Sequence, residues 1–228
     1  MITIFGASGK VGETAVREVR RRGLPVRAAI RDPLKAKSLA ELGCEIAMAD
    51  LRDLKAIKTA LEGAHNALLI CPMTPKAQDP LAEPYRTIDA ISEAVAEVNP
   101  HSIVAISDYG AHHPTGTGIA LIFHRLEQRL ESPGVNTTFL HSCEQMQNWA
   151  RFVKSVAADG VLPIFHQPRT RLLPLVSAPD VGLIAAEILS RPPDESGVTR
   201  VIHVEGPQRY SPADLVETFQ ILAGRYVR

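Results

Sequence analysis

The sequence predicts an α/β protein built on a doubly wound parallel sheet, and three observations support this. Short apolar runs alternate with longer amphipathic stretches throughout the first 145 residues. The short runs are apolar along their whole length, which is typical of strands covered by helices on both faces. A glycine-rich loop directly follows the first run and opens the first amphipathic stretch. Alternation of this kind favours parallel strands joined by crossover helices.

The predicted strands and helices of this first part follow one another in strict order. The first helix shows the reason for its assignment, because Val11, Ala15 and Val19 fall on one face and Gly23 stands where a helix commonly ends. The strands are expected at Ile2–Phe5, Val26–Ile30, Glu45–Ala49, Ala67–Ile70, Ser102–Ile106 and Thr137–Leu140. The helices are expected at Lys10–Arg22, Leu34–Leu42, Leu54–Glu62, Pro84–Val98 and Ile119–Glu131.

The pattern loosens after Asn148, where prolines punctuate a loop-rich segment. A helix at Pro179–Leu189, a strand at Arg200–Val204 and a helix at Pro212–Ala223 are expected to follow. We therefore predict a main lobe over residues 1–148 and a smaller lobe over residues 149–228, packed together as one structural unit.

Composition argues against several classes of protein. The 25 basic and 25 acidic side chains balance, so no overall field favours nucleic acid or an anionic membrane. Three scattered cysteines do not suggest a disulfide framework, which favours a reducing compartment. The apolar start of the chain is too short for a signal peptide, and no apolar run reaches the length of a membrane span. We predict a cytoplasmic protein.

The glycine-rich loop, GASGKVG at residues 6–12, has the form G-x-x-G-x-x-G between a strand and a helix. In such a loop the first glycine permits a tight turn, the second lets the backbone approach a pyrophosphate, and the third allows close helix–strand packing. This context predicts a Rossmann-like dinucleotide site. We assign the pyrophosphate to residues that form the loop and open the helix, namely Gly6, Ser8, Gly9, Lys10, Val11 and Gly12.

The residues after the second strand indicate which dinucleotide binds. NAD sites place an acidic residue there for the ribose hydroxyl, about 20 residues after the loop. Here the position carries Arg31, and Lys35 follows on the next helix. Cations of this kind match a 2′-phosphate, so we predict NADP(H), although Asp32 offers the alternative of a ribose contact.

Acidic residues also follow the third strand. Asp50 and Leu51 are candidates for the adenine end of the cofactor, whereas Asp53 is better explained as the cap of the next helix.

Several segments together resemble the NmrA-like group of atypical short-chain dehydrogenases, which includes quinone oxidoreductases of the type 2 class and isoflavone-reductase relatives. The resemblance rests on GASGKVG, AAIRDP, ADLRD, HNALLICP, IVAISDYGA and the segment from FHRLEQ to QMQNW, and it continues through PDVGLIAAEIL and VEGPQRYSPADLV. It implies an NADP(H)-binding Rossmann lobe with a small C-terminal lobe on the substrate side. It also implies that Cys71 and Pro72 line the stretch that holds the ribose and nicotinamide.

The chain departs from the family pattern in two ways. His124-Arg125 stands where the group often has a His-Lys pair, and the chain ends earlier than the family pattern does, so part of the substrate pocket wall is expected to be absent.

The usual catalytic centre of short-chain dehydrogenases, a serine with a Y-x-x-x-K motif, is incomplete here. Ser107 follows the fifth strand, but the sequence has no Y-x-x-x-K, and Tyr109 comes too early to replace its tyrosine. His124 is a candidate proton donor at neutral pH, or equally a histidine packed at a helix start. Ser107 is a second catalytic candidate, or simply ends its strand.

Two functions are compatible with these residues. The first is an NADPH-dependent reductase of a small molecule of the quinone or related carbonyl type, because hydride transfer is chemistry that the cofactor itself supplies. The alternative is an NADP(H)-sensing regulatory protein without turnover, which would act through a protein partner. We predict no metal site, no nucleic-acid partner and no membrane partner. The sequence leaves the substrate and the oligomeric state open.

Overall fold

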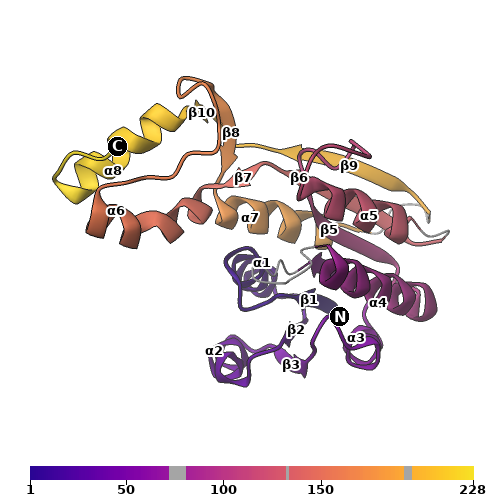
Figure 1. Cartoon of the computed structure of the whole chain (residues 1–228). Helices are drawn as coiled ribbons and strands as arrows, with labels where there is room; N and C mark the ends of the chain where they lie inside the picture. Colours follow the sequence, from indigo (N-terminus) through magenta and orange to yellow (C-terminus); the bar gives the residue numbers. More distant parts are fainter. Residues whose placement is uncertain (72–80, 132–133, 193–196) are drawn as a thin grey trace.

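The structure is a computed structural model that describes residues 1–71, 81–131, 134–192 and 197–228 (Figure 1). Its main element is a seven-stranded sheet in the order β3-β2-β1-β4-β5-β6-β9, with all neighbouring strands parallel. The predicted doubly wound, Rossmann-like fold is therefore confirmed. The strands are β1 (Ile2–Phe5), β2 (Val26–Ile30), β3 (Glu45–Met48), β4 (Asn66–Ile70), β5 (Ser102–Asp108), β6 (Asn136–Ser142) and β9 (Thr199–Val204).

Helices cover both faces of this sheet. Ile4 of β1 is fully buried in the core on one face, and its neighbour Phe5 is buried in the core on the other, which explains why the strands are apolar throughout. One face carries α1 (Lys10–Arg21), α2 (Ala36–Glu41) and α7 (Ala178–Leu189). The other carries α3 (Leu54–Leu61), α4 (Ala82–Val98) and α5 (Ala120–Leu130).

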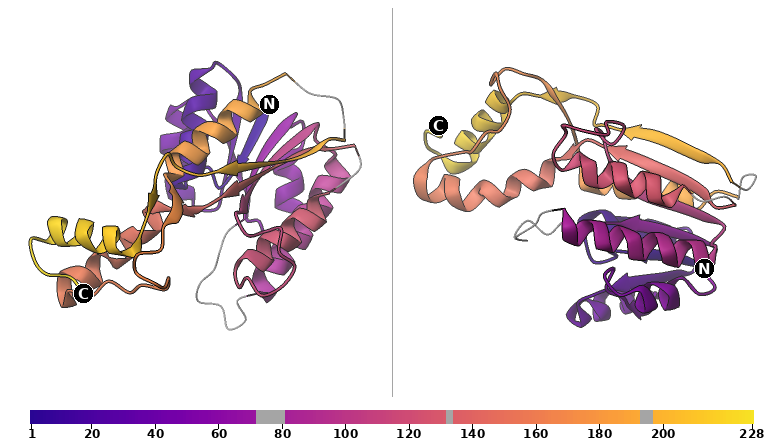
Figure 2. Two further views of the ribbon diagram at one scale, coloured as in Figure 1. Left: turned by 90° about the horizontal axis from the view of Figure 1, so that it is seen from above. Right: turned by 45° about the vertical axis from the view of Figure 1, so that its right-hand side comes forward.

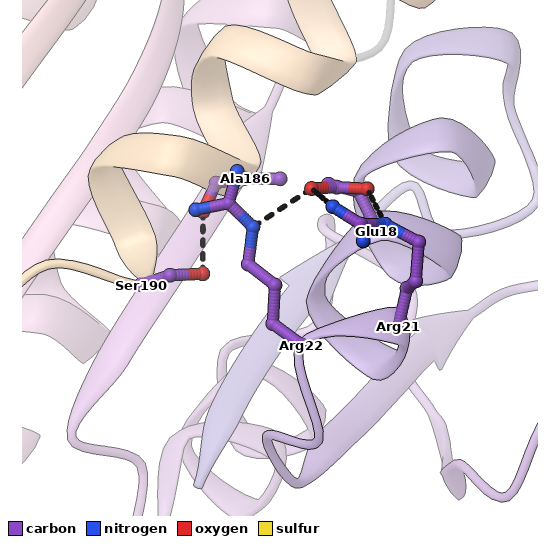
Figure 3. Close-up of polar contacts among 5 residues, drawn as sticks. All are labelled: Glu18, Arg21, Arg22, Ala186 and Ser190. Carbon is purple, nitrogen blue, oxygen red and sulfur yellow. Dashed lines mark hydrogen bonds and ion pairs between the residues drawn. The ribbon is translucent and has the colours of Figure 1, made fainter.

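Helices α1 and α7 pack closely because small residues face the contact. A Cβ atom on Gly182 of α7 would lie only 2.5 Å from the carbonyl oxygen of Val11 on α1. At the other end of the pair, Arg22 donates to Glu18 at 2.8 Å and extends toward the last turn of α7 (Figure 3). Ser190 closes that turn by donating to the Ala186 carbonyl oxygen at 2.7 Å.

The division into lobes differs from the prediction. Helix α7 and strand β9 follow residue 148, yet α7 packs on α1 and β9 pairs with β6 as the edge of the main sheet. The chain therefore leaves the main lobe near the predicted boundary at residue 148, but it later returns and adds α7 and β9 to that lobe. The order of elements in the sequence does not show that the chain returns, because pairing with β6 is a contact between distant segments.

The smaller lobe consists of the segments that remain. It contains β7 (Glu144–Gln145), the 3₁₀ helix η2 (Met146–Phe152), α6 (Val153–Asp159), β8 (Leu173–Val176), β10 (Arg209–Tyr210) and α8 (Pro212–Ala223). Its helical part has its own small core, centred on Trp149, Val216 and Phe219. The lobe projects to one side of the main sheet, beyond the carboxyl end of β6 (Figure 2).

Among the described residues, no helix is both long enough and apolar enough to cross a bilayer.

Candidate active site

The glycine loop joins β1 to α1, and its three glycines have different structural roles. Gly6 has a φ angle of +70°, which L side chains rarely adopt. A Cβ atom on Gly12 would lie 2.2 Å from the Gly6 carbonyl oxygen, so only glycine allows this approach. A Cβ atom on Gly9 would lie 3.3 Å from the same oxygen, which is tight but far less severe. The fold therefore requires Gly6 and Gly12 more strictly than Gly9.

The start of α1 is suited to an anion. Gly9 is the N-cap, with an extended backbone and no side chain to accept from the first turn. The N–H groups that open a helix lack partners within it, and the helix dipole adds partial positive charge there. Ser8 and Lys10 are exposed beside this turn, while Val11 is buried beneath it. These features fit the pyrophosphate of a dinucleotide.

The carboxyl end of β2 presents two exposed cations, Arg31 and Lys35. Between them, Asp32 caps the 3₁₀ helix η1 (Pro33–Lys35) by accepting from the backbone N–H of Leu34 at 3.0 Å. The helix predicted from Leu34 is accordingly divided between η1 and α2. Because Asp32 acts as a cap, the positive charges are the distinctive feature of this strand end.

Asp50 follows β3 and forms an ion pair with Arg52, with Nη2 and Oδ2 2.5 Å apart. Hydrogen bonds from Arg52 hold the pKa of the Asp50 carboxyl below its ordinary value, and the positive charge of Arg31 adds to this effect. Leu51 is buried. Asp53 accepts from the N–H groups of the first turn of α3, and so is the expected cap.

A cavity of about 650 Å³ opens at the carboxyl ends of β4, β5 and β6. Parallel α/β sheets bind ligands at this edge. From the sheet, its walls include Cys71, Ser107, Asp108 and Tyr109. Pro72, predicted beside Cys71, lies outside the described residues.

Apolar and charged side chains from α5 and the small lobe complete the cavity. Phe123 lines it from α5, and Phe165 lines it from the loop after α6. Glu144 and Arg151 supply charge from the small lobe, and His166 adds an imidazole. A second cavity, of about 90 Å³, lies at the amino ends of the strands, remote from the glycine loop. The larger cavity is therefore the better candidate for the substrate.

Ser107 lines the cavity and also belongs to a buried polar cluster with Glu127 and His141. Its hydroxyl donates to Oε1 of Glu127 on α5, and Nε2 of His141 on β6 lies 2.8 Å from the same oxygen. The hydroxyl proton of Ser107 is thus already used within the protein. Toward the cavity, Ser107 can offer oxygen lone pairs but not this proton.

His124 lies on α5 next to Phe123, and its catalytic role stays a prediction. It is absent from the described residues that line the cavity, and its Nδ1 lies 2.8 Å from the carbonyl oxygen of Ala111. The preceding residue, Phe123, faces the cavity instead. Successive helix residues point about 100° apart because a turn takes 3.6 residues, so the helix that aims Phe123 inward turns His124 toward the loop after β5.

Asp108 was not among the predicted site residues, although it lies just beyond the expected fifth strand. Burial raises the pKa of its carboxyl, and the negative charge of Glu127 acts in the same direction. Burial also raises the pKa of the thiols of Cys71, to about 12, and Cys143, to about 11, so both are protonated at neutral pH. The two thiols line the cavity without the thiolate character of a nucleophile.

The sequence is similar to those of two characterised NAD(P)H-dependent or quinone-reducing enzymes. The chain is 26% identical to an NAD(P)H azoreductase of Xenophilus azovorans over all of this chain and 76% of that protein. It is 35% identical to quinone oxidoreductase 2 of Escherichia coli over 72 residues, which are 31% of this chain and 25% of that protein.

Solved structures share the fold. The structure of an NADPH-dependent quinone oxidoreductase from Escherichia coli complexed with NADPH superposes with a TM-score of 0.79 at 22% identity, covering 100% of this chain and 77% of that one. The triphenylmethane reductase of a Citrobacter species, complexed with NADP(H), gives a TM-score of 0.79 at 17% identity, covering 99% of this chain and 77% of that one. The sequence match to the NmrA-like family extends from residue 1 to residue 228, and the chain therefore belongs to that family.

Proposed function

We propose that the protein is an NADPH-dependent reductase whose acceptor is a quinone or a related carbonyl compound. The observation that carries this proposal is the position of two features on one edge of the sheet. The open helix start at Gly9 follows β1, and the large cavity begins at Cys71 after β4, the strand next to β1. A dinucleotide bound across this edge would bring its nicotinamide to the cavity. The names of the azoreductase and quinone oxidoreductase relatives support the same reaction class.

The cofactor contacts that we propose follow the strand ends. The loop residues Gly6, Ser8, Gly9, Lys10, Val11 and Gly12 hold the pyrophosphate. Arg31 and Lys35 bind the 2′-phosphate, because both are exposed at the end of β2. Asp50 and Leu51 border the adenine, and Cys71 borders the nicotinamide. When bound, the nicotinamide supplies the hydride, and the role of the protein is to orient the nicotinamide and the substrate toward each other.

The protein's own side chains orient the quinone or carbonyl substrate and exclude water from it. Phe123 and Phe165 offer apolar surface to a planar ring. Ser107 donates its proton to Glu127, so it offers no hydrogen bond to a quinone carbonyl oxygen. This arrangement positions an acceptor without any Y-x-x-x-K motif, which the sequence lacks.

Oxidation of NADPH by the purified protein, measured against a panel of small quinones with NADH as the comparison, tests this proposal. We expect quinone-dependent oxidation that is faster with NADPH. Absence of turnover with every quinone, together with a protein partner whose affinity differs between NADP⁺ and NADPH, would instead establish the sensing role, since only a ligand that distinguishes two states shifts their balance.

A further inference from the structure

The cavity contains two partly buried carboxyl groups, and their surroundings differ. Asp108 comes from the end of β5 and Glu144 from β7. Burial raises the pKa of both. Neither belongs to the glycine loop or to the adenine end of the site, so neither has a place in cofactor binding as described above.

Glu144 has cationic neighbours that favour its charged form. Nε2 of His166 lies 3.8 Å from its Oε2, and the positive charges of His166 and Arg151 both act to lower its pKa. Burial outweighs these charges and leaves the pKa of Glu144 raised overall, so the two carboxyl groups differ in their contacts and not in the direction of their pKa.

Asp108 has no cation in contact with it among the described residues. Its Oδ1 accepts from the backbone N–H of Gly110 at 2.8 Å, and no other hydrogen bond or ion pair joins its side chain to the part of the chain that the structure describes. Glu127 on α5 repels its negative charge, while His141 on β6 attracts it. His203 on β9 packs edge-on against His141, with ring centroids 5.0 Å apart, and against Tyr109, with ring centroids 5.3 Å apart.

We propose that Asp108 is the catalytic acid of this site and protonates the acceptor oxygen during reduction. The inference rests on the proposed reductase function. Asp108 would supply the proton that the two predicted catalytic residues do not offer. The Ser107 hydroxyl donates to Glu127, and the His124 imidazole bonds the carbonyl oxygen of Ala111. Asp108 borders the same cavity as Ser107 from the next position of β5, with its side chain on the other face of the sheet, so its carboxyl reaches the cavity independently of the Ser107–Glu127 contact.

The proton balance of the reaction is simple. A quinone that receives a hydride from the nicotinamide gains two electrons and one hydrogen nucleus, and becomes a hydroquinone monoanion. The O–H bond of the Asp108 carboxyl then breaks and a phenolic O–H bond forms, which gives the neutral hydroquinone and a carboxylate. NADPH is oxidised and the quinone is reduced, and the Asp108 carboxylate regains a proton from water at the cavity mouth.

The pH dependence follows from the direction of the pKa change. The protonated form is the active one, so turnover is constant at low pH and falls as pH rises through the pKa of Asp108. Because burial and Glu127 raise that pKa, the fall occurs above the range of an ordinary aspartic acid. Burial also raises the pKa of Glu144, which borders the same cavity, so substitution of Glu144 is needed to separate its effect from that of Asp108.

Asp108→Asn is the main test, since the amide keeps the shape of the side chain and can still accept from Gly110. We expect its kcat at low pH to fall by on the order of 100-fold, and the fall of kcat with rising pH to disappear. Glu144→Gln is the matched control from the same cavity, and Tyr109→Phe tests the phenol hydroxyl beside Asp108. We expect both controls to keep the pH profile of the wild type.

A second measurement avoids turnover altogether. Menadione binding to the protein saturated with NADP⁺ involves no hydride, so it reports only on the cavity. We expect the menadione Kd of the wild type to rise with pH as Asp108 loses its proton, and that of Asp108→Asn to stay constant. A pH-independent Kd in the wild type, or an unchanged kcat profile in Asp108→Asn, would overturn the assignment. If no quinone is reduced but the Kd of the wild type alone changes with pH, the reductase proposal fails while Asp108 is still shown to donate to a bound carbonyl oxygen.

Discussion

The two halves of the carboxyl edge of the sheet are constructed in different ways. In the nucleotide half, β1, the loop and α1 are continuous in sequence, and the key features are glycine spacing and backbone N–H groups. In the cavity half, the walls come from the ends of β4, β5 and β6, from α5 and from the small lobe. A site made of neighbouring backbone is visible as a motif, whereas a site assembled from distant side chains is not. Substitutions in the two halves should therefore differ in what they disturb.

The largest effect is expected from Gly12→Val. Its side chain would overlap the Gly6 carbonyl oxygen, from which even a Cβ would be only 2.2 Å away. Backbone would have to move, which costs about 3 kcal/mol or more, so we expect a large drop in Tm or loss of soluble protein. Thermal unfolding followed by circular dichroism measures this.

Gly9→Val in the same loop separates folding from binding. Its Cβ would lie 3.3 Å from the Gly6 carbonyl oxygen, a contact that a small shift relieves. We expect a Tm close to that of the wild type and no detectable binding of NADPH or NADH by calorimetry, because the side chain occupies the path of the pyrophosphate. Normal nucleotide binding by this folded variant would place the site elsewhere.

Arg31→Ala is expected to change the choice of cofactor and little else. Hydrogen bonds to charged groups contribute about 1.5–3 kcal/mol, so NADPH affinity should fall roughly tenfold to a hundredfold while NADH affinity stays similar. Arg17→Ala provides a control, since Arg17 is an exposed arginine paired with Glu13 on α1. Equal wild-type affinities for the two nucleotides would contradict the assignment of Arg31 to a 2′-phosphate.

In the cavity half, Glu127→Ala should affect stability more than nucleotide binding. The change leaves the Ser107 hydroxyl and the His141 imidazole without their shared acceptor, and each buried polar group left unsatisfied costs about 1–3 kcal/mol. Glu127→Gln retains an acceptor oxygen and should recover much of the loss. Denaturant unfolding with parallel NADPH titrations checks both expectations, and a Gln variant as unstable as the Ala variant would mean that the charge of Glu127 is what matters.

The amino-acid sequence predicts the nucleotide half in detail for a physical reason. Strand ends, caps and glycine turns are local, so residue spacing alone assigns Asp53 as a cap and Gly12 as a close-packing residue. The cavity half depends on register and helix rotation. Glu127 and His141 meet because α5 packs against β5 and β6 pairs with β5, and neither contact has a signature in the spacing of residues 127 and 141. In that half, the position of Asp108 just beyond a predicted strand is a signal that sequence reasoning could have used.

His124→Ala is expected to have the smallest effect, and it tests how α5 faces the cavity. The imidazole bonds the Ala111 carbonyl oxygen and is not among the described residues that line the cavity. Its loss should cost about 1 kcal/mol, a Tm shift of about 2–4 °C for a chain of this size, with kcat within the same order of magnitude as the wild type. A catalytic proton donor would behave differently, because its removal typically lowers turnover by about 10²–10⁴-fold without weakening NADPH binding. If steady-state kinetics of His124→Ala show that larger loss, the imidazole reaches the acceptor, and the histidine on α5 has the role that we assign to Asp108.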